Sequence, residues 1–366
     1  MQFAFTEEQD QFRDIVNRFC RDKSPTTVVR HLMTTDSGFD PAVWKQLCQE
    51  VGLAGIHIPE EKGGVGFGPV ELGIVMEELG RSLLPVPYFS CCVLACTAAA
   101  EIPEAEVRDS LLSQLTSGDL LATLALEQRR GKPLTTLQTS GDDKNGYVLD
   151  GTCGLVLDGQ NADVVLAIAR TEHHSGLFKF AANAKGLTIT PCQTMDGTRK
   201  VSQISLDGVS AEKLCELDNH QIDRIYDTAL VALANEMVGG AQALLDSAVE
   251  YTKLRFQFGR AIGSFQAIKH RLADLLVDVE LARTAAYQAA QALASDEDVA
   301  SNASLAKFVA GDTYIKTALE TIQFHGGIGF TWENDTHLWF RRAKSSEVLL
   351  GVSAYHRERM LKELQI

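Results

Sequence analysis

The chain contains 366 residues, of which 45% are apolar and 22% are charged, values that are ordinary for a soluble globular protein of two or three domains. A formal net charge of −14 without a basic stripe argues against nucleic-acid binding, and no apolar run approaches the roughly 18 residues of a membrane span. The eight cysteines include no Cys-x-x-Cys pair, so we expect no metal site and interpret them as reduced thiols of a cytoplasmic protein.

The first segment, residues 1–118, carries helical patterning. Thr6–Gln9 forms a capping-box pattern, in which a threonine and a glutamine three residues later satisfy each other's backbone amides. Phe12, Val16 and Phe19 then recur at helical spacing. We therefore predict an N-terminal helical domain over residues 1–118.

The second segment, residues 119–210, changes to short runs of β-branched or alternating residues that are separated by turns. Asp163–Arg170, Gly186–Pro191 and Lys200–Leu206 are typical of strands, and helical spacing is largely missing. This pattern favours a small middle β-domain over residues 119–210.

The third segment, residues 211–366, returns to long helical patterns. A first apolar helix begins near Asp223, and we predict further helices over 264–294, 301–324 and 335–364. Four long helices with short connections predict an antiparallel four-helix bundle. The expected fold class is therefore mainly α with a central β-domain.

The connection between the first two of these helices holds a candidate binding pattern. The first helix is expected to end with Arg255, Gln257 and Phe258 and to turn at Gly259 into the next helix. Such a corner can aim a guanidinium at a phosphate while the phenyl ring covers an aromatic ring. A basic helix C-terminus that offsets the helix dipole explains the same residues equally well, so both interpretations stay open on the residues alone.

A second candidate pattern lies at Gln323–Phe330, where a predicted helix stops at the consecutive glycines Gly326 and Gly327. Backbone amides at consecutive glycines are open to the close approach of a ligand. An ordinary glycine helix stop accounts for the same residues and is favoured when this segment is considered by itself.

Three motifs in sequence order resemble one known family, the acyl-CoA dehydrogenases. Pro59–Glu61, Gly63–Gly66 and Glu77–Gly80 look like the N-terminal signature of that family. Residues 255–266 are similar to its flavin-pyrophosphate corner, and residues 323–330 are similar to its adenine-side loop. Because order and spacing are preserved over nearly the whole chain, the resemblance is specific.

The resemblance implies a fold and a cofactor. Family members have a helical N-terminal domain, a β-barrel-like middle domain and a C-terminal four-helix bundle, which matches the three segments. Their FAD lies at a subunit interface, so by resemblance this chain reaches across to a flavin held mainly by a neighbouring subunit. The residues expected to contact that flavin are Arg255, Gln257, Phe258, Gln323, Gly326 and Gly327.

The resemblance fails at the catalytic base. In the family, a carboxylate removes the α-proton of an acyl-CoA thioester, and the flavin accepts a hydride from the β-carbon. The family places its glutamate at one of two positions, which map here to Ala229 and Leu350. Neither side chain can accept a proton, so we expect no catalytic residue at either position.

Residues that would surround the flavin ring also differ from the family pattern. The family's threonine-containing loop maps to Leu126–Gly131, its ring-covering tryptophan stretch maps to Leu155–Leu157, and the threonine after the base maps to Val352. Leucines at such places leave flavin polar groups unpaired, at about 1–3 kcal/mol for each buried group. We therefore expect the chain's own ring site to be weak or empty.

These features predict the base-lacking subunit of a heterotetrameric, α2β2 acyl-CoA dehydrogenase whose homologous partner holds the base. The family includes such complexes in bacterial steroid side-chain breakdown, and Met195–Arg199 resembles a segment of that branch. By resemblance, the complex uses FAD, acts on an acyl-CoA and passes electrons to an electron-transferring flavoprotein.

Two alternatives stay open. One is an active homo-oligomeric acyl-CoA dehydrogenase whose base has moved to Asp227 or Glu347. The second of these would share a helix face with Leu350 if the helix continued that far. The other alternative is a non-catalytic scaffold of the same fold, against which the retention of Arg255 and Gln323 argues.

Overall fold

The computed structural model describes residues 5–129, 132–134, 137–142, 146–171 and 174–366. The chain divides into two compact units. One unit contains Met1–Arg30, Pro69–Leu84 and Leu230–Ile366, and the other contains His31–Gly68 and Pro85–Ala229. The N-terminal third of the chain therefore contributes to both units.

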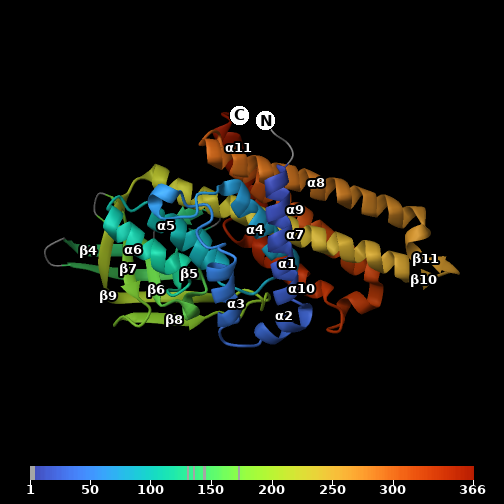
Figure 1. Ribbon diagram of the computed structural model, residues 1–366, viewed down its shortest axis with the longest axis horizontal. Coiled ribbons are helices and arrows are strands. Elements are labelled where there is room, and N and C mark those ends of the chain that lie inside the picture. The colour runs from blue at the N-terminus through green and yellow to red at the C-terminus, as the bar shows by residue number, and fades with distance from the viewer. Residues whose placement is uncertain (1–4, 130–131, 135–136, 143–145, 172–173) are drawn as a thin grey trace. The chain divides into compact units, whose positions relative to one another are not determined.

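The first unit is helical. Its elements are α1 (Glu7–Lys23), the start of α2 (Thr26–Leu32), α4 (Pro69–Ser82), most of α7 (Asn219–Leu254), β10 (Phe256–Gln257), β11 (Arg260–Ala261), η5 (Ile262–Ser264), α8 (Gln266–Ser295), α9 (Val299–His325), η6 (Gly326–Phe330), α10 (Thr336–Val348) and α11 (Ser353–Glu363). In Figure 1, α8 and α9 run side by side, and the short β10 and β11 lie at the far end of α7.

Two adjacent glycines let α7 approach its neighbours closely. A Cβ at Gly239 would lie 1.8 Å from the carbonyl oxygen of Glu77 in α4. A Cβ at Gly240 would lie 2.3 Å from the ring of Tyr314 in α9. Both distances are far below van der Waals contact, so any larger residue would push the helices apart. This packing fixes the helix whose C-terminal end carries the first candidate pattern.

The predicted capping box is confirmed at the N-terminus of α1. The Thr6 hydroxyl accepts a hydrogen bond from the Gln9 amide at 3.2 Å, and the Gln9 side chain accepts one from the Thr6 amide at 3.0 Å. Val16 is buried, as the helical spacing predicted. The helical prediction therefore holds for the start of the chain.

The second unit combines strands with short helices. Its strands are β1 (Ala122–Ala125), β2 (Glu127–Arg129), β3 (Lys132–Leu134), β4 (Gln138–Asp142), β5 (Gly146–Leu157), β6 (Val164–Arg170), β7 (Ser175–Ala181), β8 (Leu187–Pro191) and β9 (Val201–Leu217). Its helices, besides the end of α2 and the start of α7, are α3 (Pro41–Lys45), η1 (Gln46–Glu50), η2 (Glu60–Lys62), η3 (Phe89–Ala95), α5 (Cys96–Ala100), α6 (Ala105–Thr116) and η4 (Gly159–Asn161).

Five strands of the second unit close into a barrel. β4 pairs with β5, β5 with β9, β9 with β7 and β7 with β6, all antiparallel, and a single parallel contact between β6 and β4 completes the ring. β1 adds to β6, and β8 adds to β9. Closure leaves few unpaired strand edges. The barrel core includes Leu149, Val156, Val165, Phe178 and Ile204.

The mainly α fold with a central β-domain is confirmed. The predicted strands at 163–170, 186–191 and 200–206 fall on β6, β8 and the first part of β9. The predicted helices at 264–294 and 301–324 fall on α8 and α9. The domain boundaries after residues 118 and 210 stay predictions.

The prediction of one helix over 335–364 is wrong. α10 ends at Val348, and α11 begins at Ser353. Between them, Leu350 and Gly351 have φ values of 58° and 105°, which a continuous right-handed helix cannot contain. The break falls on one of the two segments where the resemblance leads us to expect a catalytic glutamate.

α7 is long and apolar enough, by length and composition, to cross a membrane. However, 89% of its most apolar 18-residue window is buried inside the protein. Burial on nearly all sides is typical of a core helix in a folded protein. Among the described residues, no second helix meets the same criteria.

Candidate cofactor-binding site

The segment after α7 is a β-hairpin, whereas the sequence predicted a simple turn between helices. Residues 256–257 pair with residues 260–261 in an antiparallel arrangement. The two turn residues, Phe258 and Gly259, have φ values of 54° and 78°. Two consecutive positive φ values are typical of a type I′ turn, whose twist matches that of the flanking strands. The pairing of the flanking strands thus holds Phe258 in a left-handed conformation that is unfavourable for a residue with a Cβ.

The hairpin presents its side chains to solvent. Phe256 is 64% exposed, and Phe258 is 91% exposed. Within the described part of the chain, the side chains of Arg255 and Gln257 have no hydrogen-bond or ion-pair partner. Exposed aromatic rings beside unengaged donors are typical of a binding surface. Figure 1 shows β10 and β11, which carry these side chains, at the far end of α7.

The second candidate pattern lies at the end of α9. Gln323 is exposed, and no described residue bonds to its side-chain amide. Gly326 has φ 65° and ψ −142°, a conformation that strongly favours glycine. A Cβ at Gly326 or at Gly327 would meet no atom within 4 Å. The glycines therefore stop the helix and also leave its terminal backbone open to a ligand.

A stacked pair of rings brings the two patterns to the same end of the bundle. The ring of Tyr251, one helical turn before Arg255, stacks on the ring of His325 with centroids 4.1 Å apart. The Tyr251 hydroxyl donates to the His325 carbonyl at 3.4 Å. Since His325 lies between Gln323 and Gly326, this contact joins the end of α7 to the end of α9.

His325 is a structural residue in its neutral form. Desolvation lowers its pKa, and the hydrogen bond between its Nδ1 and the Thr321 carbonyl, at 2.8 Å, opposes this effect more weakly. The sequence interpretation did not single out Tyr251 or His325. Their positions next to the two candidate patterns were the one sequence feature that could have drawn attention to them. Proximity to those patterns does not predict a contact between two residues that lie 74 positions apart in the chain.

The arrangement offers hydrogen-bond donors beside an aromatic surface. A guanidinium such as that of Arg255 can donate two parallel N–H bonds to a phosphate. The amides of Gln257 and Gln323 can donate to further oxygens, and Phe258 can cover a planar ring. This donor set fits the pyrophosphate and adenosine part of FAD. Within the described residues, no three His, Cys, Asp or Glu side chains gather closely enough to hold a metal ion.

The two positions at which the resemblance leads us to expect the catalytic glutamate hold buried apolar side chains. Ala229 is fully buried in α7, and Leu350 is 1% exposed in the segment between α10 and α11. An alkyl group cannot take up the α-proton of a thioester. Neither position therefore supplies a general base.

Buried polar groups hold the backbone around Leu350. Lys307 Nζ donates to the carbonyls of Glu347 at 3.2 Å and Gly351 at 3.0 Å, and His356 Nε2 lies 2.8 Å from the Leu350 carbonyl. Burial lowers the pKa of Lys307 to about 8 and the pKa of His356 to about 3. At neutral pH the lysine is therefore charged and the histidine neutral. Together they satisfy carbonyls at the C-terminal end of α10.

The structure argues against Glu347 as a replacement for the missing catalytic base. α10 ends at Val348, so the helix does not continue through Leu350 as that alternative required. Glu347 pairs instead with Lys344 at 3.0 Å. Asp227 is 3% exposed in α7 and is engaged in interactions of its own.

Leucine or valine side chains stand at four of the positions where the resemblance leads us to expect flavin-ring contacts. Leu126 and Leu157 are buried, and Leu155 is 44% exposed at an irregularity in the pairing of β5. Val352 is 42% exposed. Residues 130–131 of the aligned flavin loop lie outside the described residues. These alkyl groups cannot replace the hydroxyls and the indole N–H of the family pattern.

The fold and the hairpin describe a mainly helical protein with an exposed candidate site for a dinucleotide, and similarity to known proteins identifies the family. Residues 6–119 match the family model "Acyl-CoA dehydrogenase, N-terminal domain", and residues 229–365 match "Acyl-CoA dehydrogenase, C-terminal domain". Acyl-CoA dehydrogenase IpdE2 of Mycobacterium tuberculosis is 36% identical over 94% of this chain and 93% of its own length. The chain therefore belongs to the acyl-CoA dehydrogenase family.

Solved structures agree with this assignment. The ChsE4-ChsE5 complex from Mycobacterium tuberculosis contains a chain with a TM-score of 0.91 and 29% identity, and the match covers 100% of this chain and 99% of that one. A chain of a Tcur3481-Tcur3483 steroid ACAD variant has a TM-score of 0.88 and 30% identity, covering 98% of each chain. The family is one of FAD-dependent oxidoreductases, so FAD is the cofactor with which this protein works.

Proposed function

We propose that this chain is the base-lacking subunit of a heterotetrameric acyl-CoA dehydrogenase. In this complex, a homologous base-bearing subunit desaturates an acyl-CoA thioester between its α- and β-carbons. This chain completes the FAD site of that partner. Electron transfer to an electron-transferring flavoprotein and a cytoplasmic location belong to the same proposal.

One contrast carries the proposal. The two places for a catalytic carboxylate hold Ala229 and Leu350, which are both buried and apolar. At the end of the bundle, by contrast, Arg255, Gln257 and Gln323 keep unengaged donors on the described surface. A chain that had lost its function altogether would have no reason to keep these donors while it lost the base. The contrast therefore favours a division of labour between two subunits.

The relatives support a mixed complex and a steroid-derived substrate. Two of the similar solved structures are named as pairs of different chains, ChsE4-ChsE5 and Tcur3481-Tcur3483. The second pair is described as a steroid ACAD. By this similarity, we assign the substrate class as the CoA thioester of a steroid-derived acyl group.

In the proposed complex, FAD supplies the hydride acceptor, and the residues of this chain bind and orient the cofactor. Arg255 neutralises pyrophosphate charge through two N–H donors. Gln257 and Gln323 donate to further oxygens, while Phe258 shields an aromatic ring from water. The Tyr251 stack keeps the two donor sets at a fixed separation.

Arg255→Ala, in a complex co-expressed with a base-bearing homologue, tests the proposal. A charge-assisted hydrogen bond contributes about 1.5–3 kcal/mol, so FAD affinity should fall by a factor of about 10–150 while the complex still assembles. Arg260→Ala is the matched control, because Arg260 belongs to the same hairpin but its guanidinium lies 4.0 Å from the ring centroid of Phe265, which precedes α8. The control should keep FAD affinity within about threefold.

The homo-oligomer alternative predicts a different result. The purified chain alone would be active with one FAD per chain, and Asp227→Asn would abolish that activity, since Asp227 is the buried acid nearest in sequence to Ala229. Either result would contradict the proposed division of labour.

A further inference from the structure

Arg30 of α2 holds the loop between η6 and α10, which follows the second candidate pattern along the chain. Its Nε donates to Asp335 Oδ1 at 2.8 Å, and its Nη2 donates to the Asn334 carbonyl at 3.1 Å. The same Nη2 lies 3.3 Å from His337 Nε2, which accepts the hydrogen bond because a guanidinium can only donate. One guanidinium therefore attaches a carboxylate, a carbonyl and an imidazole of this region to the N-terminal part of the chain.

His337 and Arg341 also hold an exposed tryptophan. The His337 ring meets the Trp332 ring edge-on with centroids 4.7 Å apart, and the Arg341 guanidinium lies 4.7 Å from the Trp332 centroid. Burial lowers the pKa of His337, and the Arg30 and Arg341 guanidiniums lower it further, so the imidazole is uncharged at neutral pH. Trp332 is nevertheless 58% exposed, and Phe330 is 83% exposed. The loop thus presents two aromatic rings to solvent.

The loop also has a fixed shape of its own. The Thr331 amide and hydroxyl donate to the Ile328 carbonyl at 3.0 and 2.9 Å, and the Asn334 amide donates to the Thr331 carbonyl at 3.4 Å. Asn334 Oδ1 accepts from the amide and the hydroxyl of Thr336, the first residue of α10, at 2.9 and 2.6 Å. Because these hydrogen bonds join η6 to α10, an anchor at one end of the loop also positions η6 at the other end.

The simplest role for Arg30 is a general contribution to stability, and its exposure argues against that role. The side chains of Arg30 and Asp335 are 27% and 40% exposed. Ion pairs this open to water contribute little to the free energy of unfolding. The three contacts of the guanidinium instead restrict one loop, so we expect the effect of Arg30 to be local.

We propose that Arg30 is a positioning residue for the cofactor. By anchoring the loop after η6, it keeps the open backbone of Gly326 and Gly327 in place to meet the adenosine half of the partner's FAD. Arg30 acts through the loop and does not touch the cofactor. A loop that is ordered before binding loses less conformational entropy when the ligand binds, which strengthens binding. The inference rests on the proposed function, because it takes FAD to be the ligand of η6.

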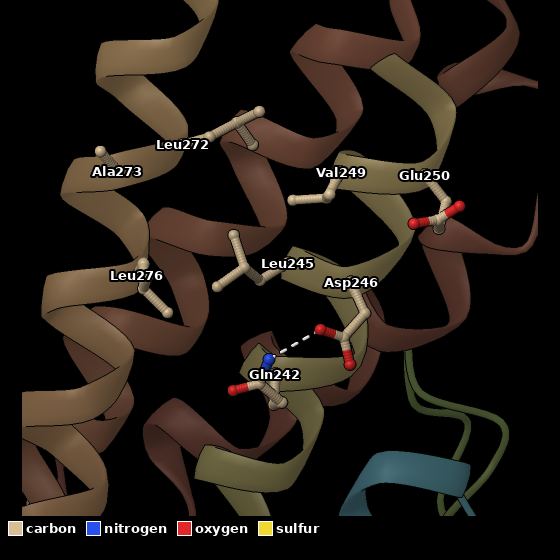
Figure 2. A pocket seen from close by; sticks show the side chains of 8 residues that line it. All are labelled: Gln242, Leu245, Asp246, Val249, Glu250, Leu272, Ala273 and Leu276. Carbon is tan, nitrogen blue, oxygen red and sulfur yellow. Dashed lines mark hydrogen bonds between the residues drawn. The ribbon is translucent and has the colours of Figure 1, made fainter. Parts of the chain in front are cut away.

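The first candidate pattern is braced independently, by α8. Leu245 and Val249 of α7 face Leu272 and Leu276 of α8 across a pocket, as Figure 2 shows. Arg255 follows the last residue of α7. Its position therefore depends on the packing of α7 against α8 rather than on the anchored loop, so the two ends of the site can be perturbed separately.

Arg30→Ala in the co-expressed complex tests this role. The freed loop must become ordered when FAD binds, so FAD affinity should fall by about five- to tenfold in flavin titrations. Arg357→Ala is the matched control, because Arg357 of α11 pairs with Asp312 and its guanidinium lies 5.0 Å from the ring centroid of Phe308. The control should keep FAD affinity within about twofold, and both variants should leave the melting temperature of the complex nearly unchanged. FAD affinity within about twofold for Arg30→Ala as well would overturn the inference.

Two double variants show whether Arg30 acts through η6. A Cβ at Gly327 meets no described atom of this chain within 4 Å, so Gly327→Ala disturbs only the contact with a ligand. In this background Arg30→Ala should lower FAD affinity by less than about twofold, because the contact that it positions is already disturbed. In an Arg255→Ala background it should still lower FAD affinity by about five- to tenfold. Equal losses in the two backgrounds would overturn the inference.

Asp335→Ala removes the same ion pair from the loop side and gives a readout that does not depend on how Arg30→Ala folds. In the full-length chain, the Thr331 amide should exchange about three to ten times faster in this variant, and FAD affinity of the complex should fall by about threefold or more. Undiminished FAD affinity would overturn the inference even if exchange is faster. If Arg255→Ala lowers FAD affinity while Arg30→Ala and Asp335→Ala do not, only this inference fails. If Arg255→Ala also leaves FAD affinity unchanged, the proposed function fails.

Discussion

The strained turn of the hairpin allows its stability to be separated from its function. Phe258 has a φ of 54°, a region that costs a residue with a Cβ about 1–2 kcal/mol. Phe258→Ala keeps this strain, whereas Phe258→Gly removes it at a backbone-entropy cost of about 0.5–1 kcal/mol. Because both variants remove the ring, their difference isolates the backbone. We expect the glycine hairpin to be more stable than the alanine hairpin by about 0.5–1 kcal/mol.

Hydrogen exchange at the base of the hairpin measures this difference. The Ile262 amide donates to the Arg255 carbonyl at 2.8 Å, and its exchange should be about two to five times slower with glycine than with alanine at position 258. In the complex, both variants should lose FAD affinity to the same extent, since both lack the ring. Equal exchange rates would refute the positive φ of Phe258. Undiminished FAD affinity would refute the role of its ring.

Three further predictions concern side chains packed within the helical unit. Burial lowers the pKa of Lys307 to about 8, so the unfolded state binds more protons than the folded state between about pH 8 and pH 10.5. The free energy of unfolding should therefore rise with pH across this window. Lys307→Met should flatten that rise in denaturant titrations. Burial lowers the pKa of His356 to about 3, so this side chain takes up a proton at a higher pH in the unfolded state than in the folded state. The free energy of unfolding should therefore fall as pH drops from about 6.5 toward 3. His356→Gln should lessen this fall. Tyr251→Phe keeps the stack on His325 and should change FAD affinity less than about threefold in flavin titrations. Tyr251→Ala removes the stack and should reduce FAD affinity by about tenfold or more. Equal effects of the two variants would contradict the role of the stack.

Periodicity predicted the long elements of the fold well. The predicted bounds of α8 and α9 lie within two residues of those observed. In these helices small buried residues such as Ala282 and Ala310 recur at helical spacing, so local pattern and tertiary packing agree. The capping box at Thr6 was predictable for the same reason, because it depends only on residues three apart.

Features that depend on tertiary contacts could not be predicted from the sequence. The break at Leu350 is stabilised by Lys307 and His356, and Lys307 lies more than 40 residues away along the chain. No local rule favours a positive φ at a leucine. Phe258 in a type I′ turn is a similar case, since asparagine and glycine are the residues that usually signal such a turn.

The candidate site was predictable only in part. The six residues expected to contact the cofactor came from the resemblance to a family, and their role stays a prediction. The structure adds that Arg255 and Gln323 are exposed, and that the Tyr251–His325 stack holds their helix ends together. Sequence spacing could not supply that contact, because the two rings come from different helices.

The flavin content and activity of purified material test the central claim most directly. The chain expressed by itself should retain little FAD and show no acyl-CoA dehydrogenase activity. Its complex with a base-bearing homologue should be active, with one FAD for each pair of different chains. One FAD per chain in an active, homogeneous preparation of this polypeptide alone would contradict the account.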